Sequence, residues 1–293
     1  MKAIPISLLF LLLGVIAYSP CSLATEYRPI VLDPSYEHDK WQTLPQDQIF
    51  HFGAYTTSFD GPDDDNGDGH PDKWGIPQWV AFEIKRFTVD HPLKTRPQKW
   101  MTDTQLHSKL IAPDDETYSV SGTKDLPEVK TDYRFVRGHM CPKDTAERIS
   151  ENAAFNTHTV LNAVPQLQWQ NNGVWKKIEE LCLTWADKYG RVWIVTGPVF
   201  FGRKPSLWLG QGDEVRAAIP DALFKIVIRQ EGDGVDALAF LISNILPKAE
   251  KNPAQFLVSV DRIESLTGLD FLTVLSNDTQ DKVESKVPNT LSW

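Results

Sequence analysis

The sequence is poor in cysteine, with three among 293 residues. Cys21 lies in an N-terminal segment discussed below, which leaves Cys141 and Cys182 for the rest of the chain. A framework of several disulfides is therefore excluded, and at most one bridge can form between these two. Whether the two thiols pair or stay free and buried is left open, because a sequence does not give the distance between them.

Long hydrophobic runs are also lacking. The most apolar stretch, residues 6–17, is shorter than the roughly 20 residues that a bilayer-spanning helix needs. Lys2 precedes it, and a small-x-small cleavage pattern follows at residues 22–24, so residues 1–24 are predicted to be an export signal peptide. A membrane anchor is the alternative, but no basic stop follows the run. We expect a secreted or periplasmic protein without a membrane anchor after cleavage.

The chain lacks internal repeats and long linkers. Its composition, 41% hydrophobic and 24% charged, is that of an ordinary globular protein. Helical spacing at 174–188, stopped by Gly190, and at 261–267 is mixed irregularly with strand-like runs. Residues 25–293 are therefore predicted to form a single α+β domain. The strand-like runs, rich in aromatic and β-branched residues, are 79–89, 133–140, 191–200, 222–228 and 238–244.

Basic residues are fewer than acidic ones, 30 against 39, so the formal net charge is −9. Such a balance argues against a generally basic, nucleic-acid-binding surface. Six of the negative charges, however, are aspartates between residues 60 and 72, whereas basic residues gather elsewhere. We therefore expect a local basic cleft on an acidic body. The gathered basic residues are Lys94, Arg96, Lys99, Arg134, Arg137, Lys143, Lys176 and Lys177.

The acidic segment GPDDDNGDGHPD has the spacing of the first half of a calcium-binding loop. Its twelfth position is Gly75, where an EF-hand would place a bidentate glutamate. We predict that the insert at residues 61–75 binds one structural calcium ion, and a solvated acidic turn is the alternative. The predicted ligands are Asp64, Asn66, Asp68 and Asp72.

A short segment, YRFVRGHMCP at residues 133–142, places Arg137 two residues before His139. In a strand these two side chains share a face, and Val136 points to the other face and can enter the core. A neutral histidine is a usable general base near pH 7, and an arginine beside it can bind a phosphate in a bidentate way. An isolated Arg-Gly-His is more often a surface turn or a core histidine, so this motif needs support from elsewhere in the chain.

That support comes from NAVPQLQWQNNGVWKKIEE at residues 162–180 and from KTRPQKW at 94–100. Together with Arg-Gly-His, these segments resemble the sugar-non-specific DNA/RNA endonucleases of the ββα-metal class, which include secreted bacterial nucleases and mitochondrial endonuclease G. The resemblance runs from about Trp79 to Phe271 with order and spacing kept. The matching positions are Arg96, Asn162, Pro165, Gln166, Asn171, Trp175 and Glu179.

The resemblance implies a ββα-metal nuclease fold, with a central, mainly antiparallel sheet flanked by helices. It also implies a non-specific enzyme that hydrolyses phosphodiester bonds of DNA, RNA or both and leaves 5′-phosphates. His139 would be the general base, and Asn171 the direct ligand of one magnesium (or manganese) ion. Glu179 would bind that ion through water.

The same resemblance gives Arg96 and Arg137 the role of binding the phosphate and the charge of the transition state. Asn162 would contribute to substrate binding by shaping the loop that places Asn171. Two alternatives stay open, since Asn171 could be a helix N-cap and Glu179 an exposed helix residue.

One departure from the family pattern is Val136, which stands where the family has aspartate. Strand alternation turns this position away from His139, so its loss should affect support more than chemistry. A rival hypothesis is a catalytically silent extracellular protein that binds nucleic acid, or is stabilised by calcium, on a nuclease scaffold. A third is a phosphodiesterase of small nucleotides.

Overall fold

The structure is a computed structural model. It describes residues 28–60, 74–101, 112–118, 134–202, 205–210, 214–248 and 250–291. The predicted signal peptide and the predicted calcium ligands Asp64, Asn66, Asp68 and Asp72 lie outside the described residues, so both stay predictions. Across these ranges, no helix combines the length and the apolar character that a membrane crossing requires.

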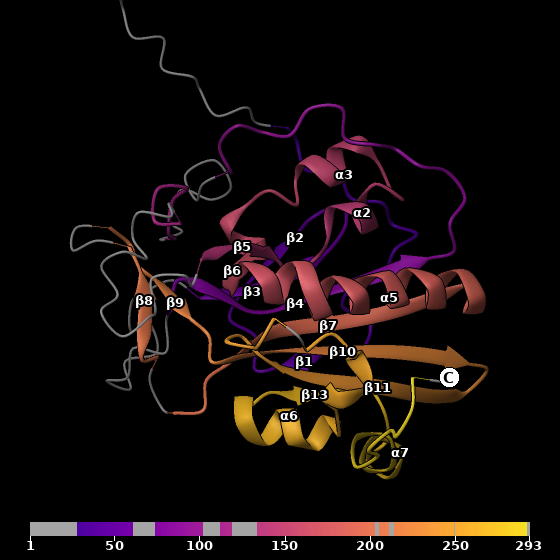
Figure 1. The fold of residues 1–293 in the computed structure, drawn as a ribbon. Helices are drawn as coiled ribbons and strands as arrows, with labels where there is room; N and C mark the ends of the chain where they lie inside the picture. Colours follow the sequence, from indigo (N-terminus) through magenta and orange to yellow (C-terminus); the bar gives the residue numbers. More distant parts are fainter. Residues whose placement is uncertain are drawn as a thin grey trace, which may run out of the picture.

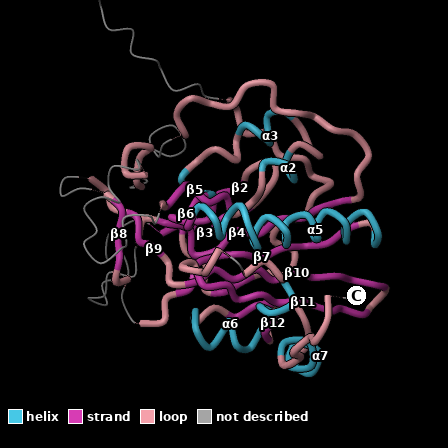
Figure 2. The backbone as a smooth tube through the Cα atoms, in the orientation of Figure 1, coloured by secondary structure: helices cyan, strands magenta, loops and turns pink. Residues whose placement is uncertain are grey.

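A seven-stranded antiparallel sheet forms the centre of the fold (Figures 1 and 2). Its middle strands, β10, β7 and β4, are buried along most of their length. In spatial order the strands are β12 (Leu257–Val258), β11 (Gly234–Ser243), β10 (Ala222–Glu231), β7 (Arg191–Val199), β4 (Ile76–Lys85), β3 (Thr56–Asp60) and β2 (Gln48–His51).

Three two-stranded ribbons accompany this sheet, and the ribbon of β5 (Phe135–His139) with β6 (Ala163–Leu167) carries the Arg-Gly-His segment. The other ribbons pair β8 (Leu207–Leu209) with β9 (Ala217–Ile219), and β1 (Thr43–Leu44) with β13 (Asp270–Phe271). The helical segments are α2 (Lys143–Ala146), α3 (Glu151–Phe155), η2 (Val160–Asn162), α4 (Gln168–Gln170), η3 (Asn171–Trp175), α5 (Lys176–Tyr189), η4 (Pro253–Phe256), α6 (Val260–Thr267) and α7 (Asn277–Glu284).

Alternate residues of the strands feed two separate cores, one on each face of the sheet. Val80 and Phe82 of β4 pack in the core that contains α5, whereas Trp79 packs in the core that contains α6. This follows from the twofold side-chain period of a strand that is covered on both faces. Figure 1 accordingly shows α5 on one side of the sheet and α6 and α7 on the other. The predicted α+β class with a mainly antiparallel sheet flanked by helices is confirmed.

The strand predicted at residues 79–89 is shifted in the structure. It begins at Ile76 and ends at Lys85. Arg86 instead donates its backbone N–H to Gly190 O at 2.7 Å, and its Nε donates to Asp187 O at 3.0 Å. These bonds tie the end of β4 to the end of α5, a contact that no local sequence pattern indicates.

The two cysteines of the described chain, Cys141 and Cys182, are free and buried. Burial raises the pKa of Cys182 to about 12 and the pKa of Cys141 well above its ordinary value, so both thiols stay protonated at neutral pH. In this structure they are core residues on the α5 side of the sheet.

His38 makes the stability of the fold dependent on pH. Its Nδ1 accepts a hydrogen bond from the Glu83 backbone N–H at 3.1 Å, so the neutral ring carries its proton on Nε2, which faces Gly53 O at 3.4 Å. Burial lowers the pKa of His38 from 6.5 to about 4. The unfolded chain therefore binds a proton here more tightly than the folded chain does, and protonation of Nδ1 removes the acceptor for Glu83.

We expect the free energy of unfolding to fall by up to about 3 kcal/mol, on account of His38, as the pH drops from 6.5 through 4. Above pH 6.5 this loss is absent. Urea unfolding of wild type and of His38→Asn, whose amide oxygen can replace Nδ1, measures the difference between the two profiles. The variant should be less sensitive to acid over this interval, while His51→Asn, a change at an exposed histidine of β2, should follow wild type. Parallel profiles for wild type and His38→Asn would contradict the assignment.

Candidate active site

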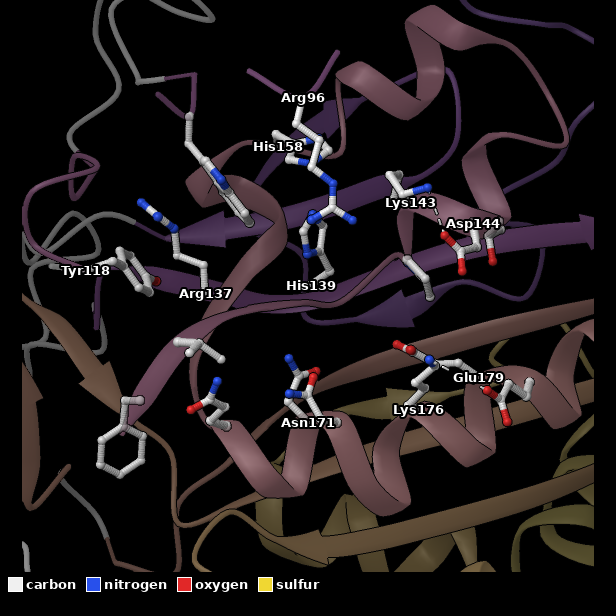
Figure 3. Close-up of a pocket in the computed structure, with 18 of the residues that line it drawn as sticks. Arg96, Tyr118, Arg137, His139, Lys143, Asp144, His158, Asn171, Lys176 and Glu179 are labelled. Carbon is white, nitrogen blue, oxygen red and sulfur yellow. Dashed lines mark ion pairs between the residues drawn. The ribbon is translucent and has the colours of Figure 1, made fainter. Parts of the chain in front are cut away.

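A pocket of about 560 Å³ opens beside β5 and the start of the long helical stretch (Figure 3). Separate segments of the chain line it: the loop around Arg96, Tyr118, the segment from Arg134 through strand β5, the beginning of α2, His158 and residues 168–183. The residues that the sequence motifs singled out as catalytic or as magnesium-binding therefore meet here, although 83 positions separate Arg96 from Glu179 along the chain. The pocket is the candidate active site.

Strand β5 presents Arg137 and His139 to this pocket, as strand alternation predicts (Figure 3). The residue between them must be glycine, because a Cβ at Gly138 would overlap the side chain of Gln166 on the paired strand β6. The Arg-Gly-His spacing thus joins two requirements: close packing of the ribbon on one face and two functional side chains on the other.

The prediction that Val136 enters the core is wrong. Val136 is half-buried and lines the pocket, because β5 and β6 form a two-stranded ribbon separate from the main sheet. The side chain of Val136 therefore lines the pocket at the position where the family pattern has an aspartate.

His139 lies in a ring of aromatic side chains with one nitrogen unsatisfied. Its ring centroid is 4.7 Å from that of Trp100 and 5.0 Å from that of His158. Nε2 is enclosed and has no hydrogen-bond partner among the residues that the structure describes. Burial, followed by His158 and then Arg96, lowers the pKa of His139 well below its ordinary value. The ring is therefore neutral at pH 7 and can accept a proton.

His158 is a pocket residue that the motifs did not indicate. It is 3% exposed, and its Nδ1 donates to the carbonyl oxygens of Ala154 and Phe155, each at 3.2 Å. Since carbonyls only accept, the proton is on Nδ1, and the Nε2 lone pair is enclosed without a partner. Burial lowers the pKa of His158 to about 4. No spacing rule marks a histidine in the irregular turn after α3.

The two predicted arginines are both at the pocket but in different settings. Arg137 forms an ion pair with Asp115 and lies over the ring of Trp100, 5.2 Å from its centroid. Arg96 is exposed, lines the pocket and lies near His139 in Figure 3. Arg137 is thus held in place by its neighbours, whereas Arg96 projects from a loop toward solvent.

Asn171 lies inside a helical stretch and is not an N-cap. It has φ −57° and ψ −53°, and the stretch begins earlier, at Gln168. A π-helical turn at Asn171–Trp175, with Gly173 outside helical geometry, joins α4 to α5. Such turns occur often at functional sites because they re-aim the residues that precede them. Here Asn171 lines the pocket (Figure 3).

Glu179 lines the pocket two turns later on the same helix and is half-buried, so it is not an exposed helix residue. Burial raises its pKa to about 7, and the positive charge of Lys225 acts in the opposite direction. Lys225 is 1% exposed and lies 4.2 Å from the ring centroid of Trp175. An amide oxygen and a half-buried carboxylate oxygen on one pocket wall are donors that magnesium accepts, so this wall fits a hard divalent cation.

Asn162 does not fit the predicted role in substrate binding. It is fully buried and lies outside the residues that line the pocket. Its Oδ1 accepts from Cys141 N at 2.8 Å, and its Nδ2 donates to the carbonyls of Cys141 and Thr157 at 2.9 and 3.0 Å. Two of these three hydrogen bonds hold the turn that follows His139, so Asn162 supports the position of His139.

The basic cleft predicted from charge clustering is present in part. Lys143 is paired with Asp144 and Glu147 at 2.9 and 2.7 Å, and Lys177 donates to Lys251 O on another surface. The cleft therefore carries mixed charges with a basic excess on its upper wall in Figure 3. Its basic lining residues are Arg96, Arg134, Arg137, Lys143 and Lys176.

Comparison with known proteins agrees with this geometry. A family model described as DNA/RNA non-specific endonuclease matches residues 72–278. A Serratia marcescens nuclease is 30% identical over 71% of this chain and 73% of its own length. The mitochondrial nuclease EXOG of Danio rerio is 30% identical over 68% of this chain, and the match spans 56% of that protein. A crystal structure of an EndoG/EndoGI complex has the same fold, with a TM-score of 0.59 and 16% identity over 83% of this chain and 92% of that chain.

Proposed function

The chain belongs to the DNA/RNA non-specific endonuclease family, and from that premise we propose that its pocket hydrolyses phosphodiester bonds of DNA, RNA or both without sequence specificity. One observation carries the proposal. The pocket brings together a neutral histidine with an unpartnered Nε2, two arginines, and an amide and a carboxylate on a helix. These are the groups that attack of water on a phosphate diester requires.

His139 acts as the general base in this proposal. Its Nε2 has no hydrogen-bond partner among the described residues, so with the proton on Nδ1 it can take a proton from an attacking water molecule. Trp100 and His158 pack against the ring and fix its plane. Asn162, through Cys141, fixes the turn that ends β5. A bound phosphate would bring negative charge and raise the pKa of His139 toward a value suited to proton transfer.

Arg96 and Arg137 bind the phosphate. The guanidinium of Arg137 is oriented by Asp115 and Trp100, so it loses little side-chain entropy on binding. Arg96, on its exposed loop, can follow the substrate. Because both contact phosphate and not base edges, binding of this kind is insensitive to sequence.

Asn171 and Glu179 would hold a magnesium ion, or manganese in its place. When bound, the ion supplies positive charge that stabilises the phosphate and the departing 3′ oxygen, which leaves a 5′-phosphate on the product. Lys225, buried 4.2 Å from the ring centroid of Trp175, favours the charged form of Glu179 and so opposes the rise in its pKa that burial causes. Secretion or export to the periplasm rests on the N-terminal sequence pattern and is part of the proposal.

Incubation of the purified protein with supercoiled plasmid and with structured RNA tests the proposal. We expect the plasmid to pass through nicked and linear forms to short fragments with magnesium, and to stay intact with EDTA. A small chromogenic phosphodiester should be a much poorer substrate than plasmid. A protein that binds DNA but leaves plasmid and RNA intact with magnesium would instead favour the catalytically silent nucleic-acid-binding protein. Val136, in place of the family aspartate, is the reason to consider that alternative.

A further inference from the structure

A second group of acidic side chains lies on the other face of the sheet from the active site. Asp261 and Glu264 share one face of α6, being three residues apart, and Glu284 is the last residue of α7 (Figure 1). One carboxylate oxygen from each residue lies within 4.8 Å of the others. Three negative charges are thus brought together from two helices where they pack on the second core.

Glu284 distinguishes this group from an ordinary acidic surface patch. The residue is 4% exposed, and its Oε1 is enclosed without a hydrogen-bond partner. It also stands at the carboxyl end of α7, where the helix dipole disfavours negative charge. A carboxylate in this position is costly unless a cation or a donor compensates it.

Among the described residues, the nearest polar groups supply that compensation only in part. The Gln280 amide donates to Asp270 Oδ1 and to Phe271 O, both at 2.8 Å, and its interaction with Glu284 leaves the Oε1 atom of that carboxyl group without a partner. Lys286, two residues beyond Glu284, is paired with Asp236 at 2.6 Å.

The carboxylate of Glu264 has one oxygen engaged in a hydrogen bond. Glu264 accepts from the Phe271 N–H through Oε1 at 2.9 Å, which anchors its side chain and leaves its other oxygen for a ligand.

We propose that Asp261, Glu264 and Glu284 form a calcium site that joins α6 to α7. Carboxylate oxygens are hard donors, and calcium accepts irregular arrangements of them together with water. Asp261 is exposed, so solvent can complete the coordination, and the buried Glu284 supplies the anchoring charge. Magnesium, which demands near-ideal octahedral geometry, fits two helices with fixed side chains less well. The bound ion would fasten the C-terminal helices to the sheet and has no part in the cleavage reaction.

Thermal unfolding with EDTA and with calcium tests the site. The protein used carries Asp64→Ala and Asp68→Ala, so that the predicted loop at residues 61–75 cannot contribute. We expect calcium to raise the Tm of this protein by roughly 5 to 10 °C at about a hundredfold excess over its Kd. Glu284→Gln keeps the shape and removes the charge, so this added change should abolish most of the shift.

Asp281→Asn is the matched control, because Asp281 is an exposed acid on the same helix and lies outside the group. It should keep the full calcium shift. Equilibrium dialysis with labelled calcium should show one ion fewer bound to Glu284→Gln than to the control, and Glu264→Gln should behave like Glu284→Gln. Magnesium-dependent plasmid cleavage should be the same in all three proteins, which separates this site from the active site. Equal calcium shifts in Glu284→Gln and Asp281→Asn would overturn the proposal.

Discussion

His139→Ala is expected to slow cleavage of plasmid DNA roughly 100- to 10,000-fold, the usual cost of losing a general base. The reason is local, because Nε2 of His139 is an enclosed acceptor in the pocket with no other partner. The fold should survive, since the change removes one side chain from the pocket lining and leaves the β5–β6 pairing intact. Initial rates at saturating magnesium and DNA, with the Tm of each protein, measure the effect.

Two controls limit the interpretation. His91→Ala, at an exposed histidine outside the pocket, should cleave at the wild-type rate. The DNA affinity of His139→Ala should stay within a few-fold of wild type, because arginine and lysine contacts to phosphate carry most of the binding. A folded His139→Ala protein that cleaves at a near-normal rate would exclude the role of general base.

Asn171→Ala should lower the turnover number by at least about 100-fold, with a much smaller effect on DNA affinity. Asn171 lines the pocket on the same helical stretch as Glu179, where it would supply the direct oxygen ligand to the cation. Loss of that ligand would weaken the binding of the cation, whose positive charge acts mainly in the transition state. Such a loss lowers kcat more than it raises KM. Rates measured over a magnesium titration separate the two effects.

The neighbouring exposed Asn172 provides the control, since Asn172→Ala changes the same residue type on the same wall. It should keep both turnover and magnesium dependence. Glu179→Gln should be equal to or milder than Asn171→Ala, because Glu179 is expected to act through water. An Asn171→Ala protein whose KM rises while kcat is unchanged would make the metal assignment wrong.

The parts of the fold that local patterns control were predictable from the sequence. Strands β7 and β10 are continuous apolar runs, and both lie where the runs predict them. Helices α5 and α6 end at Gly190 and Gly268, whose φ values of 93° and 72° favour glycine. The family resemblance added the residues of the pocket, and the structure brings Arg96, Arg137, His139, Asn171 and Glu179 together there.

Other features depend on contacts between distant segments, and the sequence did not indicate them. Val136 lines the pocket because the β5–β6 ribbon stands apart from the main sheet, and strand alternation alone cannot show that. His158 and Lys225 carry no spacing signal, since their importance comes from burial beside His139 and Glu179. Asp115 pairs with Arg137 from an irregular segment 22 positions earlier. The π-helical turn depends on the non-helical backbone of Gly173 within a run that otherwise has helical spacing.

Chemical rescue of His139→Gly tests most directly the central claim, that His139 takes the proton from the attacking water. The variant leaves a space beside Trp100 and His158 that a small base can enter. We predict that added imidazole restores plasmid cleavage in a saturable way, and that the restored rate rises with pH through the pKa of the added base and not that of the protein. A folded His139→Gly protein that binds DNA and magnesium but shows no rescue by imidazole or its methylated forms, or a wild-type protein that leaves plasmid intact with magnesium, would contradict the account.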